Sequence, residues 1–226
     1  MVGTSGQALP QPAPVKPRLR GVSHQWAFFV SLATGGALIS AAHGSRALIG
    51  VGVYAGSLSA LLGVSALYHR VNWRPFARRF MRRLDHAMIF VLIAATNTPF
   101  ALLALHGKLA TAILISAWTG ALCGFLVELA WREHPKWASS MIGMVLGWVG
   151  VVTLTQLPST IGWLAVVVLA LGGAVYTAGA VVYARERPNP LPGVFGYHEV
   201  FHALVLLAVA LQYGVIAFAV LPLANR

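Results

Sequence analysis

Two histidines lie four residues apart at the start of the last long apolar stretch, "GYHEVFHALVLLAVALQYGVIAF". His198 and His202 share one helix face, because residues i and i+4 are separated by about 6 Å along the helix axis. Two imidazoles so placed can bind one metal ion, and a third from another helix would complete the site. Neutral imidazole suits zinc, and three protein ligands with one open position are typical of catalytic zinc sites.

Two other segments carry groups that would complete such a site. "SALYHR" places Ser65 and His69 on one helix face, and "RRLDHAMIF" contributes Asp85. His69 is the candidate third ligand. Zinc lowers the pKa of a bound water to about 7, so that water becomes a nucleophile near neutral pH. Asp85 could then serve as base or proton carrier, and Ser65 could hydrogen-bond to an imidazole or to the substrate.

Plainer interpretations stand beside this one. A single histidine at a membrane interface often only contacts water, and Asp85 could be a first-turn acid favoured by the helix dipole. Glu128 could pair with an arginine. Haem is disfavoured, because His198 and His202 on one helix face cannot clamp one iron from opposite sides. The interfacial interpretation is preferred for the remaining polar groups: His24, His43, His86, His106, His134 and Glu199.

The elements that must position these groups are membrane helices. The chain has 226 residues, of which 58% are hydrophobic and 9% charged, with a mean hydropathy of +0.75. Apolar stretches of about 20 residues, long enough to cross a bilayer, recur along it. We therefore expect an all-α integral membrane protein in the cell membrane. Seven spans are predicted: Trp26–His43, Arg46–His69, His86–Leu105, Leu109–Trp131, Ala138–Gln156, Ile161–Ala184 and Tyr197–Leu221.

The positive charges predict the orientation of this seven-transmembrane-helix bundle. Thirteen of the 16 lysines and arginines fall on the N-terminal side of the predicted membrane, and the other three fall on the opposite side. The positive-inside rule then places the N-terminus in the cytoplasm and the C-terminus outside. All the candidate site residues would lie near the cytoplasmic face. The arginines between Arg70 and Arg83 are expected to contact anionic lipid.

The remaining organisation is simple. Residues 1–20 are proline-rich without periodicity and are predicted to be a disordered cytoplasmic tail, followed by one transmembrane domain over residues 21–226. The net charge of +11 could suggest nucleic acid, but the charges form short clusters between spans, so we expect no nucleic-acid partner. Cys123 is the only cysteine, which excludes an intramolecular disulfide and a cysteine-based zinc ribbon.

The segments "SALYHR", "RRLDHAMIF" with "ATNTPFALL", and "YHEVFHALV" resemble the hemolysin III family, within the wider group of progestin and adipoQ receptors. The resemblance covers nearly the whole chain. It implies seven helices, a cytoplasmic N-terminus and a zinc ion near the inner face. The family pattern assigns the ligands to His69, His198 and His202, with Asp85 near the zinc-bound water and Ser65 beside the site.

One position departs from that pattern. Asn97 stands where relatives carry the tyrosine of G-T-Y-T-P, which would alter how a pore or a substrate is packed but not the metal ligands.

Three functions follow as hypotheses. The first is a zinc-dependent intramembrane hydrolase of a lipid amide or ester, with the lipid entering from the inner leaflet; eukaryotic relatives are linked to ceramide hydrolysis, so a ceramidase-like activity is implied by analogy. The second is a receptor-like regulator of membrane lipid state in which zinc is structural. The third is a pore-forming, hemolysin-type protein, which would need a polar stripe through several helices.

Overall fold

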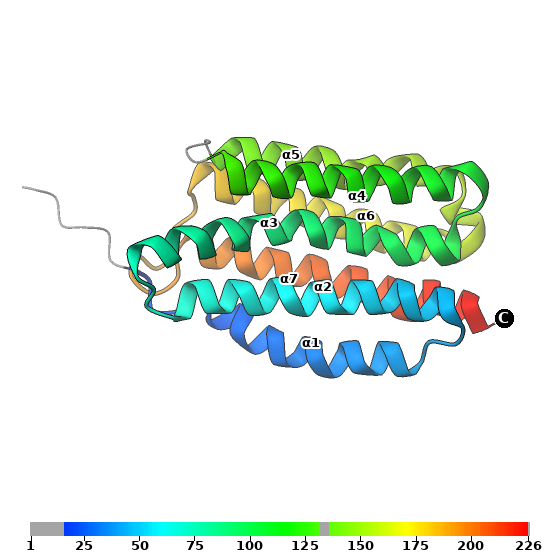
Figure 1. Cartoon of the computed structure of the whole chain (residues 1–226), viewed down its shortest axis with the longest axis horizontal. Helices are drawn as coiled ribbons and strands as arrows, with labels where there is room; N and C mark the ends of the chain where they lie inside the picture. Colours follow the sequence, from blue (N-terminus) through cyan, green and yellow to red (C-terminus); the bar gives the residue numbers. More distant parts are fainter. Residues whose placement is uncertain (1–15, 132–135, 226) are drawn as a thin grey trace, which may run out of the picture.

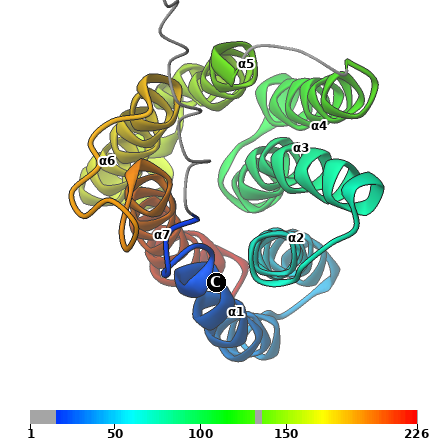
Figure 2. The same ribbon diagram turned by 90° about the vertical axis from the view of Figure 1, so that its left-hand side faces the viewer.

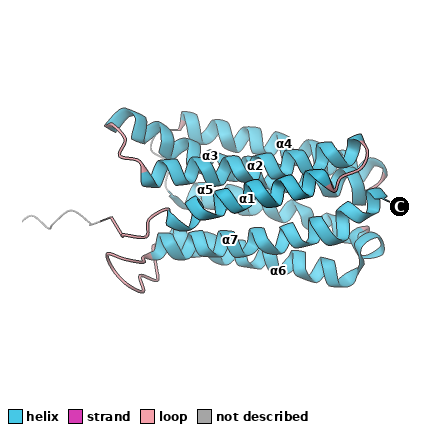
Figure 3. Cartoon of the chain, turned by 90° about the horizontal axis from the view of Figure 1, so that it is seen from below, coloured by secondary structure: helices cyan, strands magenta, loops and turns pink. Residues whose placement is uncertain are grey.

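The computed structural model describes residues 16–131 and 136–225, and the regular elements of these residues are helices (Figure 3). The one exception is an isolated bridge between Leu191 and Phe195. The predicted tail therefore lies largely outside the described residues, as does His134. The α-helices are α1 (Val22–Ser40), α2 (Ser45–Arg70), α3 (Pro75–Pro99), α4 (Gly107–Ala130), α5 (Lys136–Trp148), α6 (Leu157–Arg185) and α7 (Tyr197–Val215).

The helices follow one another around a ring, and α7 closes the ring beside α1 (Figure 2). Their axes lie roughly parallel to the long axis of the molecule (Figure 1). Short connections make neighbours in the sequence antiparallel neighbours in space. As a result α2 ends, and α7 begins, at the same end of the bundle, on the left in Figure 1. This end is called the histidine end below.

Five of the helices are long and apolar enough to cross a membrane: Ser45–Arg70, Pro75–Ala104, Gly107–Ala130, Leu157–Arg185 and Tyr197–Ala224. This agrees with the predicted multi-pass membrane protein. Helix α5 is shorter, and a 3₁₀ segment, Val149–Thr155, continues it. The structure thus confirms a helical bundle with several spans, while the membrane crossing of α1 and α5 and the side on which each terminus lies remain predictions.

The start of α3 differs most from the sequence prediction. The third span was expected from His86, after an arginine-rich loop, but α3 begins at Pro75. Proline is well suited to the first turn of a helix, because its missing N–H would have no partner there. The segment "PFARRFMRRL" is amphipathic, so it forms a helical extension rather than a loop. Asp85 lies ten residues inside this helix, which excludes the interpretation of Asp85 as a first-turn acid.

Two features of α3 set its position in the bundle. A β-carbon added at Gly124 of α4 would stand 2.6 Å from the ring of Phe90, so only glycine lets α3 and α4 approach this closely. Near the other end, Pro99 removes a backbone donor, and a π-helical turn over Phe100–Ala104 follows it. Phe90 and Pro99 are both buried.

Candidate metal centre

His69, His198 and His202 come together at the histidine end. His69 lies in the last turn of α2, and the other two lie in the first turns of α7. Each ring offers one nitrogen such that the three nitrogens lie within 4.8 Å of one another, and all three residues are buried. The sequence spacing correctly placed these imidazoles together, because i and i+4 share a face and antiparallel helices bring the end of α2 beside the start of α7.

The donor set fits a zinc ion. Two nitrogens bound to zinc at about 2.1 Å in tetrahedral geometry are separated by roughly 3.4 Å. The Nε2 atoms of His69 and His198 are 3.1 Å apart. The Nδ1 atom of His202 is buried and has no hydrogen-bond partner among the described residues. An unpartnered buried nitrogen is costly, and a metal or a further hydrogen-bonding group would relieve that cost.

Asp85 and Ser65 both lie beside the three histidines. The Oδ2 atom of Asp85 is 3.6 Å from the Nε2 atom of His69. Both residues are buried, with 8% of Asp85 and 1% of Ser65 exposed, and both line the same cavity. A carboxylate in this position can exchange a proton with a group held at the metal.

His24 is a fourth histidine at this site, and the sequence interpretation missed it. It was expected to be wet at the interface, but only 3% of it is exposed. Its ring stacks on that of His202, with centroids 3.8 Å apart and planes 7° from parallel, and its Nδ1 lies 2.9 Å from Ser65 Oγ. Parallel rings at this separation cannot both point a lone pair at one ion, so His24 orients His202 and Ser65 instead. The antiparallel order of the spans, which puts the start of the first span at the histidine end, was the available signal.

A short segment before α1 joins the two ligand-bearing helices. The ammonium of Lys16 donates to the carbonyl of His69, and Arg20 forms an ion pair with Glu199 of α7. The N–H groups of Arg18 and Leu19 donate to the loop before α7, at Gly193 and Val194 (3.0 and 3.2 Å). We call residues 16–21 the N-terminal clasp.

Glu199 thus serves the fold rather than contacting water. Only 3% of it is exposed. One carboxylate oxygen pairs with Arg20, and the other accepts the N–H of Gly196 at 2.8 Å, which caps the start of α7. The interfacial interpretation of Glu199 was therefore wrong. Burial, and then the nearby cations Arg70, Arg78 and Arg20, lower the pKa of Lys16 below its usual value.

His86 and Glu128 form a second polar group that links four helices. His86 Nδ1 is 3.7 Å from a carboxylate oxygen of Glu128, and its Nε2 is 3.3 Å from the hydroxyl of Tyr183. Ser139 donates a hydrogen bond to the same carboxylate, of which only 1% is exposed. His86 was expected to be a solvated interfacial histidine; it instead ties α3 to α4 and α6.

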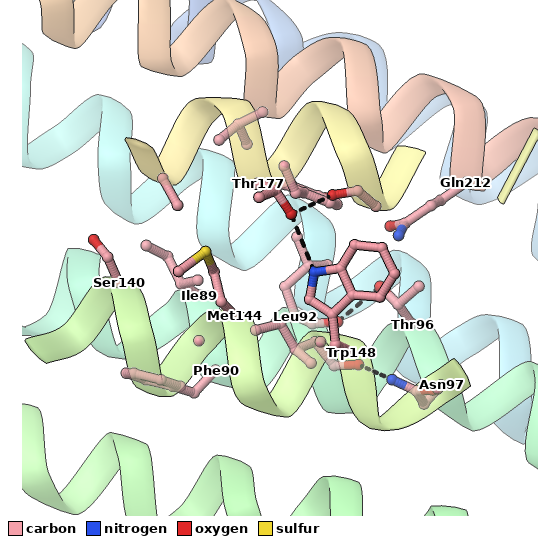
Figure 4. A pocket seen from close by; sticks show the side chains of 18 of the residues that line it. Ile89, Phe90, Leu92, Thr96, Asn97, Ser140, Met144, Trp148, Thr177 and Gln212 are labelled. Atoms are coloured by element: carbon pink, nitrogen blue, oxygen red, sulfur yellow. Dashed lines mark hydrogen bonds between the residues drawn. The ribbon is translucent and has the colours of Figure 1, made fainter. Parts of the chain in front are cut away.

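A cavity of about 310 Å³ leads away from the histidines between α3, α5, α6 and α7. At one end it is lined by His24, Ser65, Asp85, His198 and His202. It reaches Gln212 on α7, which at 1.5 Å per residue is about 21 Å from His198. Most of the wall between is apolar. Figure 4 shows its deeper part, lined by side chains such as Ile89, Phe90, Leu92 and Met144.

The chain is similar to several known proteins. A family model described as haemolysin-III related matches residues 13–213. Hemolysin-3 of Bacillus cereus is 31% identical over 184 residues, which cover 81% of each chain. A Hemolysin-3 homolog of Bacillus subtilis is 27% identical over 68% of this chain and 69% of its own. The human monocyte to macrophage differentiation factor is 26% identical over 71% of this chain and 66% of its own. No solved structure matches the chain.

Proposed function

This chain belongs to the haemolysin-III-related family, within the wider group of progestin and adipoQ receptors, and on that premise we propose that it is a zinc-dependent hydrolase of a membrane lipid. Zinc would be bound by His69, His198 and His202. The bond cleaved would be an amide or an ester, as in a ceramidase-like reaction.

One observation carries this proposal: His198, His202 and Asp85 line one end of a long, mostly apolar cavity, and His69 lies directly beside them. A purely structural metal site needs no such space beside it. An acyl chain needs a dry channel, and the cavity runs for about two thirds of the thickness of a bilayer's hydrocarbon core. A lipid whose chain fills the cavity would present its carbonyl group to the histidine end.

The chain's own residues supply the proton transfers. Zinc, when bound, polarises the carbonyl and lowers the pKa of the attacking water. Asp85 takes a proton from that water while the oxygen of the water bonds to the carbonyl carbon of the lipid. The carbon–nitrogen bond then breaks, and Asp85 returns the proton to the leaving nitrogen. The products are a fatty acid and an amine, or an alcohol where the substrate is an ester.

Ser65 and His24 would hold the constellation in place. The bond between them fixes the direction of the serine hydroxyl, and the stacked rings fix the plane of His202. Such outer partners of metal ligands change metal affinity or activity by about 10- to 100-fold when they are removed.

The basic clasp and the arginines of α3 suggest how the lipid approaches. If the N-terminus is cytoplasmic, the histidine end faces the inner leaflet, which is rich in anionic lipid. Positive charge there would attract anionic headgroups and would also hold the carboxylate product. Membrane lipid is thus the proposed substrate, and anionic lipid a proposed surface partner.

The decisive experiment measures zinc and turnover together. Purified protein in lipid nanodiscs is given a ceramide and a matched acyl ester, before and after zinc is removed with a chelator and restored. We expect turnover that disappears with zinc and returns with it. Bound zinc without turnover of any lipid amide or ester would support the receptor-like alternative. Dye release from vesicles that does not depend on zinc would support the pore-forming one.

A further inference from the structure

Four polar side chains surround the cavity far from the histidines, where a simple acyl chain would need none. We call Thr96, Asn97, Thr177 and Gln212 the mid-cavity belt; Figure 4 shows them around the indole of Trp148. All of them line the same cavity as His202 and Asp85. Gln212 lies ten residues beyond His202 on α7, which is about 15 Å along the helix.

Most of the donors in this belt are already used. Thr96 donates to the Leu92 carbonyl at 2.8 Å, and Asn97 donates to the Ile93 carbonyl at 2.8 Å. Thr177 donates to the Gly173 carbonyl at 2.9 Å and accepts the indole N–H of Trp148 at 3.1 Å. These bonds are internal to the wall, and the amide oxygen of Asn97 accepts no hydrogen bond from the described residues, so it can accept one from a ligand.

Gln212 is the exception. Its side-chain amide makes no hydrogen bond within residues 16–131 and 136–225, and it lines the cavity. Its side chain leaves α7 across Gly172 of α6, where an added β-carbon would stand 3.5 Å from the Cγ atom of Gln212. An amide at this depth in a membrane protein is costly unless it meets a polar partner.

The charge of the belt limits what that partner can be. The described residues that line this part of the cavity include no lysine, arginine, aspartate or glutamate. A charged headgroup would find no counter-ion here, whereas a neutral hydroxyl can accept from one amide and donate to the other. The distance to His202 corresponds to about a dozen carbons of an extended chain.

We propose that the mid-cavity belt binds a hydroxyl group carried within the acyl chain of the lipid. The preferred ligand is then an oxygenated acyl lipid, with its polar substituent about a dozen carbons from the carbonyl at the histidines. The inference rests on the proposed function only for which end of the lipid meets the histidines. Gln212 and Asn97 are the residues that determine this preference.

The test measures binding rather than turnover. A fluorescent fatty acid bound to purified full-length protein in nanodiscs is displaced by stearic acid or by its analogue with a hydroxyl about a dozen carbons from the carboxyl group. We expect the hydroxylated acid to bind on the order of tenfold more tightly, the scale of one well-made hydrogen bond. Gln212→Leu should remove this preference without weakening the binding of stearic acid, and Asn97→Leu should reduce it.

Gln156→Leu is the matched control, because Gln156 bonds to the backbone of His106 and lies outside the cavity; it should keep the preference. Equal affinity of the two acids in the wild type, or a preference that survives Gln212→Leu, overturns the inference. If the preference is present but no lipid is hydrolysed, only the proposed hydrolase is lost. If unsubstituted lipids are hydrolysed and no preference is found, only the mid-cavity belt is lost.

Discussion

Gly21 lies directly against His69. A β-carbon at position 21 would stand 2.4 Å from the β-carbon of His69, closer than real β-carbons ever approach, and Gly21 has a φ of +79°. The last residue of the clasp thus fixes how closely the end of α2, which carries one proposed ligand, can approach the start of α1. Because α1 also carries His24, the close contact at Gly21 sets the position of His69 relative to the His24 ring, which stacks on His202.

Gly21→Ala should therefore disturb the metal site through His69. The added methyl group must push α2 aside, so we expect zinc affinity to fall about tenfold or more and the melting temperature to fall as well. Gly44→Ala is the matched control: Gly44 has a φ of +81° but nothing within 4 Å of an added β-carbon. It should cost stability through backbone strain alone and leave zinc affinity unchanged. Equal loss of affinity in both variants would mean that the contact with His69 is irrelevant to the site.

Zinc content tests the ligand set itself. Elemental analysis after mild purification should find close to one zinc per chain, because three imidazoles converge within bonding reach of one ion. His202→Ala should lose most of the metal. His106→Ala should keep it, because His106 is exposed and belongs to the loop before α4. Equal zinc in the two variants would rule out this site.

Variants of Asp85 and His198 should distinguish the loss of lipid hydrolysis from the loss of bound metal. Asp85→Asn should keep zinc and the fold, since Asp85 is proposed to carry a proton and not to bind the metal. It should lower lipid hydrolysis by about 10²-fold or more, the usual scale for removing a general base. His198→Ala should instead lose zinc and thermal stability together, because metal binding contributes to folding. If both variants lose stability alike and the wild type shows no turnover, zinc is structural.

The two contacts of His24 can be tested with two different substitutions. His24→Ala removes both the stack on His202 and the bond to Ser65, so zinc affinity should fall by about 10- to 100-fold. His24→Phe keeps a ring over His202 and should retain most of the affinity. The visible spectrum of the cobalt-substituted protein reports the geometry of the site directly, and it should change in the alanine variant but little in the phenylalanine variant. Identical spectra in wild type and His24→Ala would show that His24 does not position the ligands.

The predicted orientation can be tested with reporters that work on only one side of the membrane. The distribution of basic residues predicts a cytoplasmic N-terminus. A reporter active only outside the cytoplasm should work when fused after Arg226 and should be silent in the connection between α2 and α3. The insertion belongs at residues 71–74, since the structure shows that α3 already begins at Pro75. The reverse pattern would move the histidine end to the outer face.

The helical membrane architecture and the convergence of the three imidazoles could be predicted from the sequence. Long apolar runs specify membrane helices, because hydrocarbon leaves the backbone few other ways to satisfy its hydrogen bonds. The spacing of His198 and His202 fixed their common face, and the short connections fixed which helix ends meet. Together these relations predict that His69 and Asp85 lie at the same end of the bundle as the histidine pair.

The extent of α3 and the partners of His24, Glu199 and His86 depend on how the helices pack. The arginine-rich segment before Asp85 was predicted to be a loop because of its many charges. It is an amphipathic helix, and its apolar side is stabilised only by packing against other parts of the protein. Three polar groups were predicted to contact water at the interface, because the partners that pair with them lie on other elements. The pairs are His24 with Ser65, Glu199 with Arg20, and His86 with Glu128. The cavity and its polar belt are spaces between helices. The residue pattern of a segment indicates its own secondary structure and which of its sides is apolar. Contacts across the ring of helices depend on how several segments pack together, so the pattern of one segment does not predict them.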